Sequence, residues 1–181
     1  MVAVLVVAAV VAIPFGGWQH VDRADAAAEH LEPGERHVAD QFATTLDRAV
    51  VMRVSPGSSL DPEPGVSYLV VYGRMDNRTD RTQSPRTDMF VLDSDQAELA
   101  DLDRLDTVTL VADPGSFVHL QPGLPADVAI VWEIEKGLLE PGDELRIGIV
   151  DRTSAESQVG GGTVWLDPRI GAVVDLAVGS P

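Results

Sequence analysis

Residues 127–136 alternate between apolar and charged side chains more regularly than any other part of the chain. The apolar positions share one parity and the acidic ones fall between them: Val128, Ile130, Trp132 and Ile134 against Glu133 and Glu135. Because successive side chains of a β-strand point to opposite faces, this pattern predicts a strand with one buried and one exposed face. Such a strand needs a sheet around it and a second layer to cover its apolar face.

Elsewhere beyond residue 40, the chain contains further short runs rich in residues that favour β-strands. Pro-Gly pairs, which favour turns, follow or precede several of them, and we find no convincing helical periodicity. The predicted strands are Phe42–Val54, Val66–Met75, Met89–Leu92, Thr107–Ala112, Asp127–Lys136, a run through Leu145–Ile149, Thr163–Leu166 and Ala172–Val178. Val66–Met75 is apolar on both parities and is therefore expected to be central. About eight such strands are buried most simply as an all-β, antiparallel, immunoglobulin-like sandwich.

The N-terminus has a different character. From Val2 to Ile13 every residue is Val, Ala, Leu or Ile, and the apolar stretch continues to Trp18. It is shorter than the roughly 20 residues of a comfortable transmembrane helix and resembles the core of a signal peptide. Small-residue cleavage patterns near residues 24–28 lie farther away than usual, which favours an uncleaved anchor. A buried core element is the alternative.

These features predict three parts of the chain. Residues 1–18 are a signal peptide or membrane anchor, residues 19–38 a linker, and residues 39–181 the sandwich domain, which is preceded by the apolar N-terminal segment. The expected location is extracytoplasmic, either anchored to the cytoplasmic membrane or secreted.

The charge and the missing cysteines exclude several classes of function. Thirteen basic against 29 acidic residues give a net charge of −16, and this opposes binding to nucleic acid or to anionic lipid by charge. Membrane association would have to come from the apolar segment. Without cysteine there are no disulfides, thiolate metal sites or cysteine nucleophiles.

The order of the motifs resembles a bacterial envelope family of unknown function with an immunoglobulin-like fold, akin to the mycobacterial immunoprotective extracellular antigen. After the apolar leader, the shared features are Tyr68-Leu69-Val70-Val71-Tyr72 running into Asp76-Asn77-Arg78-Thr79, then Met89-Phe90-Val91-Leu92-Asp93, Leu120-Gln121-Pro122-Gly123 before Val128-Ala129-Ile130-Val131-Trp132, and Leu145-Arg146-Ile147-Gly148-Ile149. The resemblance covers about residues 42–178. It implies a secreted or anchored protein and no catalytic residues to carry over.

An acidic segment offers the first candidate ligands. Asp93, Asp95, Asp101 and Asp103 could supply oxygen atoms to a hard cation such as calcium. The segment lacks the glycine and the oxygen ligand of a helix–loop–helix calcium loop, so we expect a solvated loop. These four aspartates, with Trp165 as the best surface aromatic residue for glycan stacking, are the candidate ligand-surface residues.

Metal and catalytic patterns are weak. The histidines His20, His30, His37 and His119 show no zinc-binding spacing, and three of them lie in or beside the expected linker. The nearest approach to a hydrolytic pair is Ser116 with His119, which we interpret as a turn serine and a strand-edge histidine. We therefore expect no catalytic residues, no metal and no cofactor. Asn77-Arg78-Thr79 has the pattern of a glycosylation sequon.

The sequence thus predicts a non-enzymatic, extracytoplasmic module, membrane-anchored or secreted, that serves a protein partner or assembly in the cell envelope. The alternative is a carrier domain for a small ligand, a glycan or a cation. In either case, the protein would contact the membrane through its N-terminal segment, and no nucleic acid partner is expected.

Overall fold

The computed structural model describes residues 28–92, 105–156 and 162–180. The apolar N-terminal segment and the aspartates Asp93, Asp95, Asp101 and Asp103 lie outside these ranges. Within them, no helix has the length and apolar character needed to cross a bilayer.

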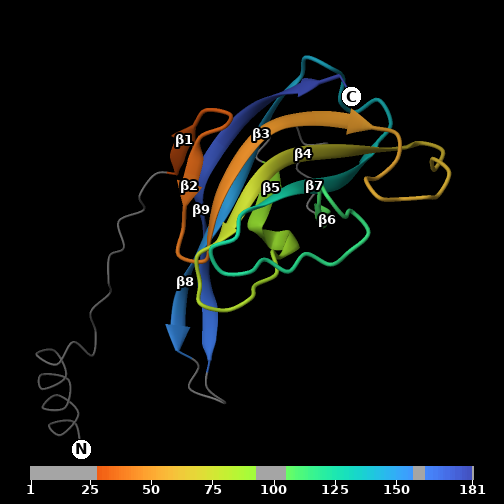
Figure 1. The fold of residues 1–181 in the computed structure, drawn as a ribbon. Helices are drawn as coiled ribbons and strands as arrows, with labels where there is room; N and C mark the ends of the chain where they lie inside the picture. Colours follow the sequence, from red (N-terminus) through yellow and green to blue (C-terminus); the bar gives the residue numbers. More distant parts are fainter. Residues whose placement is uncertain (1–27, 93–104, 157–161, 181) are drawn as a thin grey trace, which may run out of the picture.

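Nine strands make up nearly all of the regular structure (Figure 1). In chain order they are β1 (Glu29–Leu31), β2 (Arg36–Val38), β3 (Phe42–Met52), β4 (Val66–Asn77), β5 (Phe90–Leu92), β6 (Leu105–Leu110), β7 (Ala126–Glu135), β8 (Glu144–Glu156) and β9 (Thr163–Gly179), with one 3-10 turn, η2 (Thr87–Met89), before β5.

The strands form two layers that are joined at one corner. Sheet A contains β1, β9, β8 and β5, and sheet B contains β2, β3, β4, β7 and β6. Most pairs are antiparallel, but β1 pairs with β9 in parallel, and the end of β9 pairs in parallel with β3 at Ala49 and Val50. The chain passes from sheet A to sheet B between β1 and β2, at the Pro33-Gly34 turn. The predicted all-β sandwich is confirmed.

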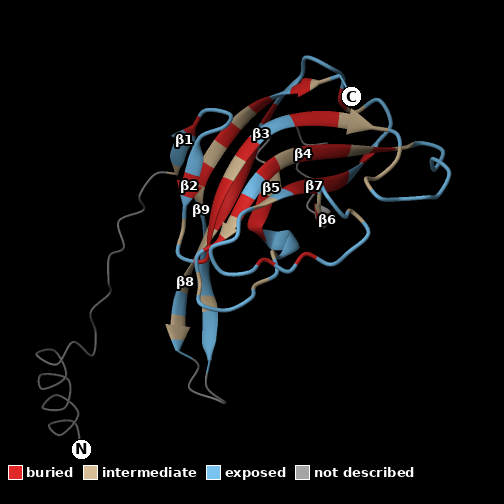
Figure 2. Ribbon diagram, in the orientation of Figure 1, coloured by how far each residue is buried: buried red, intermediate tan, exposed pale blue. Residues whose placement is uncertain are grey.

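The core lies between the two sheets (Figure 2). Trp132 is 1% exposed and packs in the core with the other inward residues of β7, while Glu133 is exposed, as the alternation predicted. Val66–Met75 was expected to be a central strand, and β4 indeed lies between β3 and β7. Its second apolar parity is also covered, because Val70 packs on the outer face of sheet B against Val50, Ala129 and Val131.

Two parts of the chain differ from the expectation. Residues 29–38, expected in the linker, include β1 and β2, which pair with β9 and β3. The two strands expected at Thr163–Leu166 and Ala172–Val178 are one long strand, β9, which stays paired with β8 despite two register shifts. Tertiary pairing thus orders segments whose own sequence carries little β signal.

A two-stranded arm extends beyond the sandwich. It consists of residues 151–156 of β8 and 163–170 of β9, and we call it the β8–β9 arm. β5 accompanies β8 only at Ile147–Ile149 and β1 accompanies β9 only at Ala172–Val174, so no third strand of the described chain pairs with the arm. Figures 1 and 2 show it as a projecting, mostly exposed ribbon.

Candidate functional site

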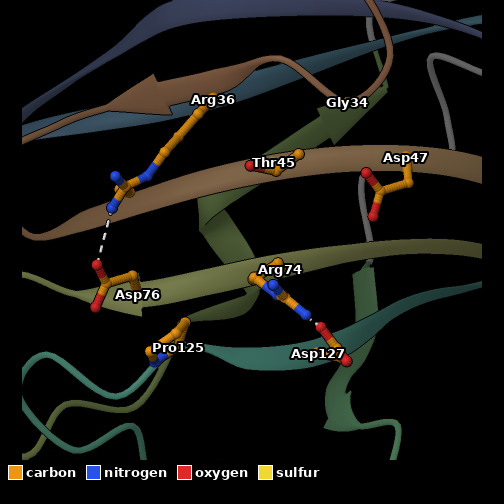
Figure 3. Close-up of a pocket in the computed structure, with 9 residues that line it drawn as sticks. Gly34, Arg36, Thr45, Asp47, Arg74, Asp76, Pro125 and Asp127 are labelled. Atoms are coloured by element: carbon orange, nitrogen blue, oxygen red, sulfur yellow. Dashed lines mark hydrogen bonds and ion pairs between the residues drawn. The ribbon is translucent and has the colours of Figure 1, made fainter.

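A polar pocket lies on the outer face of sheet B, where β2, β3, β4 and β7 run side by side. Its volume is about 620 Å³. The lining residues are Gly34, Arg36, Ala43, Thr45, Asp47, Arg74, Asp76, Pro125 and Asp127. In Figure 3, Thr45 and Asp47 lie on the strand between Arg36 on one side and Arg74 on the other.

Two ion pairs cross the pocket from strand to strand. Arg36 Nη2 donates to Asp76 Oδ2 at 2.8 Å, and Arg74 Nε donates to Asp127 Oδ1 at 2.8 Å. The second pair is open to solvent, and its hydrogen bond raises the pKa of the Arg74 guanidinium. Exposed pairs of this kind contribute little to stability, so the pair can exchange partners at low cost.

Asp47 lines the pocket from β3, beside a β-bulge. The register of β3 against β4 shifts between Leu46 and Arg48, which leaves Asp47 as the extra residue of the bulge. Opposite it, a Cβ on Gly73 would overlap the carbonyl oxygen of Thr45, so glycine permits the close approach of the two strands. Asp47 keeps the parity of Ala43 and Thr45, and the bulge shifts the parity of the residues that follow it.

The pocket contains more acidic than basic side chains. Asp47 is exposed and has no hydrogen bond or ion pair with the described residues. Asp76 Oδ1 is covered and accepts no hydrogen bond, while Oδ2 of the same carboxylate holds Arg36. Three carboxylates against two guanidinium groups leave one negative charge. The pocket therefore favours a ligand group that donates hydrogen bonds and carries positive charge.

A second polar cluster lies at the base of the β8–β9 arm, and both ring nitrogens of its histidine have a carboxylate partner. His37 of β2 is buried; its Nε2 lies 2.8 Å from Asp151 Oδ1 of β8, and its Nδ1 lies 3.4 Å from Glu29 Oε2 of β1. The hydrogen bond with Asp151 raises the pKa of His37 against the opposing effect of burial, and Glu29 adds to the rise. An imidazolium donates from both nitrogens, so this arrangement suits the protonated ring.

This cluster ties the two sheets together rather than forming a metal site. The two carboxylates face opposite nitrogens of one ring, so they do not converge on a common point. In the ranges that the structure describes, no group of three His, Asp or Glu side chains could hold a metal ion. The other described histidines contact different partners: His30 pairs with Asp175 at 3.1 Å and His119 with Ser84.

The Ser116 and His119 considered from sequence are not hydrogen-bonded to each other. Ser116 Oγ donates to Asp113 Oδ2 at 2.6 Å, while His119 Nδ1 lies 2.9 Å from Ser84 Oγ, 35 residues earlier. Ser84, Ser116 and His119 all line a second pocket of about 380 Å³. No carboxylate of the described residues orients His119, so the arrangement lacks the third member of a hydrolytic triad.

The remaining sequence candidates are placed as follows. Trp165 lies on the β8–β9 arm, is half-buried and does not line the polar pocket. Asp93, Asp95, Asp101 and Asp103 lie outside the described residues. Asn77, the sequon residue, is 1% exposed and its amide bonds the backbone carbonyls of Arg81 and Leu120, so it holds two loops together.

No protein-family model and no curated protein matches this sequence. Solved structures match distantly. An uncharacterised β-sandwich protein from Clostridium difficile is 9% identical with a TM-score of 0.48, covering 85% of this chain and 97% of its own. A functionally unknown protein from Listeria monocytogenes is 10% identical with a TM-score of 0.39, covering 75% and 80%. The apo PCuAC domain from PmoF1 is 12% identical with a TM-score of 0.34, covering 81% and 100%. The resemblance to the envelope family stays a prediction.

Proposed function

We propose that this protein is a non-enzymatic module, held outside the cytoplasm by its apolar N-terminal segment, that binds a basic segment of a protein partner through the polar pocket of sheet B. The observation that carries the proposal is Asp47, a carboxylate with no hydrogen bond or ion pair among the described residues, in a pocket of about 620 Å³ between two Arg–Asp pairs.

The chemistry of the pocket selects a lysine or arginine side chain. Such a group donates to Asp47 and can share Asp127, whose pair with Arg74 is exposed on both sides. Arg36 and Arg74 weaken the repulsion that three carboxylates alone would exert on an anionic group. Together with the aspartates, they place positive and negative side chains in a fixed order across the pocket. A mixed pattern of this kind supports recognition of a particular register of charges on a partner.

The charge of the whole chain supports the same class of partner. A net charge of −16 attracts a basic segment over distances comparable to the Debye length, about 8 Å at physiological ionic strength. Binding to the pocket should therefore weaken as salt is added.

The absence of an oriented catalytic group in the second pocket supports a binding role. Ser84 and His119 are both exposed, and the described residues supply no carboxylate to His119. The Val2–Ile13 run supports export or anchoring, since the sandwich domain itself offers no reason for twelve consecutive aliphatic residues.

Calorimetric titration with short lysine- and arginine-containing peptides tests the proposal. The wild-type protein should bind them with an affinity that falls with salt, and Asp47→Asn should weaken binding. The matched control is Glu133→Gln on β7, which removes the same charge from the same outer face of sheet B at a site away from the pocket.

Two outcomes would overturn the protein-partner proposal. Equal losses in Asp47→Asn and Glu133→Gln would show that only the global charge matters. Binding of free argininamide as tight as that of every peptide would identify a small-ligand carrier instead.

A further inference from the structure

Strand β1 is short, and the two ion pairs described for it both involve a histidine. It pairs with β9 over three residues, of which only Leu31 is buried. Glu29 Oε2 of β1 lies 3.4 Å from His37 Nδ1, and His30 Nε2 of β1 lies 3.1 Å from Asp175 Oδ2. Each contact is an ion pair only while its imidazole ring is protonated. The attachment of β1, at one side of the sandwich in Figure 1, should therefore depend on pH.

His37 is buried between strands that bring two carboxylates to its ring. It lies on β2 opposite Thr44 of β3, and the described charged groups that act on it are Glu29 of β1 and Asp151 of β8. A protonated ring offers one N–H to each carboxylate. A neutral ring has a single N–H, so one of the two carboxylates must then face a nitrogen lone pair.

The geometry determines which carboxylate loses its hydrogen bond. His37 Nε2 lies 2.8 Å from Asp151 Oδ1, whereas Nδ1 lies 3.4 Å from Glu29 Oε2. The side chain of Asp151 is 15% exposed and that of Glu29 is 61% exposed. Because a covered carboxylate without a hydrogen bond costs more than an exposed one, the neutral ring keeps its hydrogen on Nε2. The lone pair of Nδ1 then faces Glu29, and the two acceptors repel each other.

We propose that the proton on His37 controls how often β1 leaves the edge of β9. With the ring protonated, Glu29 holds β1 in place; with the ring neutral, β1 opens while β2 stays bound through Asp151. Opening frees the backbone of Ala172–Val174 as a sheet edge. It also adds residues 29–35 to the chain between the sandwich and the N-terminal segment, a consequence that rests on the anchoring in the proposed function, whereas the opening itself does not.

Both histidines favour attachment at low pH. The hydrogen bond with Asp151 raises the pKa of His37 above 6.5, so its contribution is complete below pH 6.5 and is lost as the pH rises through the folded pKa. Loss of the His30 proton acts in the same direction, because it ends the ion pair with Asp175. Arg146 still binds Asp175 at 2.8 Å, so that carboxylate does not need β1.

Hydrogen exchange of the wild type and of Glu29→Gln, followed by mass spectrometry at pH 6 and pH 9, tests this inference. Glutamine has nearly the shape of glutamate and carries an NH2 group that can donate to the neutral Nδ1 of His37. The ratio of the two exchange rates at one pH removes the direct effect of pH on exchange. The matched control is Glu32→Gln, which removes the same charge from an exposed residue immediately after β1.

The ratio of wild-type to Glu29→Gln exchange in β1 should rise about fivefold from pH 6 to pH 9, the size expected for an ion pair that is partly exposed. The ratio for Glu32→Gln should stay constant, as should the exchange of β4 amides. A constant ratio for Glu29→Gln would overturn the inference. A matching change in β4 would assign the effect to global unfolding, and opening of β2 in step with β1 would show that Asp151 does not retain His37; either result would also overturn it.

Discussion

Two of the charged clusters that the structure describes, one around His37 at the arm base and one in the polar pocket, differ in how their groups are paired. At the arm base, both nitrogens of the buried His37 face a carboxylate. In the polar pocket, Asp47 has no hydrogen bond or ion pair among the described residues and one oxygen of Asp76 accepts no hydrogen bond. Matched buried groups lock strands together, whereas unmatched ones in a cavity are available to a ligand. Stability and binding should therefore separate between the two places.

The largest expected effect is on the arm base. Asp151→Ala leaves the buried His37 ring without its closest partner and should cost about 3 kcal/mol of unfolding free energy, within the range for a broken buried pair. Asp127→Ala removes the carboxylate of an exposed pair and should cost less than about 1 kcal/mol. Urea unfolding of both variants measures this contrast, and equal losses would erase the distinction between the two places.

Gly171→Ala tests the same cluster without removing a charge. The new methyl group would overlap the Asp151 carboxylate and push it from His37, which should cost about 1–3 kcal/mol. Gly115→Ala, where a Cβ meets nothing within 4 Å, is the control and should stay within about 0.5 kcal/mol. A neutral Gly171→Ala would mean that Asp151 is not held where the structure has it.

The third effect is on the pH dependence of stability. The folded protein raises the pKa of His37 above 6.5, so the stabilisation it provides is complete below pH 6.5 and is lost as the pH rises through the folded pKa. A tenfold difference in proton affinity between the folded and unfolded states corresponds to about 1.4 kcal/mol. The unfolding free energy of the wild type minus that of His37→Gln should therefore be larger at pH 6 than at pH 9. A difference that is constant between these two values would contradict the charged pairing.

The smallest effect on stability is expected in the pocket. Asp47→Asn removes an exposed carboxylate with no hydrogen bond or ion pair among the described residues and should change the unfolding free energy by no more than about 0.5 kcal/mol. Thermal or urea unfolding of the free protein checks this. A loss of several kcal/mol would assign Asp47 a structural role instead.

The sheets could be predicted from the sequence because burial leaves a local signature. Trp132 and Glu133 alternate as a half-buried strand requires, and the apolar run around Val70 indicates a strand covered on both faces. The boundaries of β3, β4 and β7 agree with the expected strands within about two residues.

The two charged clusters could not be predicted, because long-range pairing creates them. His37 meets Asp151 across 114 residues, and only the pairing of β1 and β2 into different sheets brings them together. Alternation puts Asp47 on the same face of β3 as Thr45, but the Arg–Asp pairs beside it come from β2, β4 and β7, and the bulge next to it has as its local sign the glycine at position 73 of the neighbouring strand. Alternation alone gives no information about register shifts.

The most direct test of the whole account is the change that a basic peptide produces in the urea midpoint, compared among the wild type, Asp151→Asn and Asp47→Asn. A ligand that binds only the folded state raises stability by an amount set by its affinity. We predict that Asp151→Asn starts from a lower midpoint yet keeps the peptide-induced increase, while Asp47→Asn starts at the wild-type midpoint and loses the increase. If the urea midpoint without peptide and the peptide-induced increase both fall in either variant, the result would contradict the separation of stability at the arm base from binding in the polar pocket.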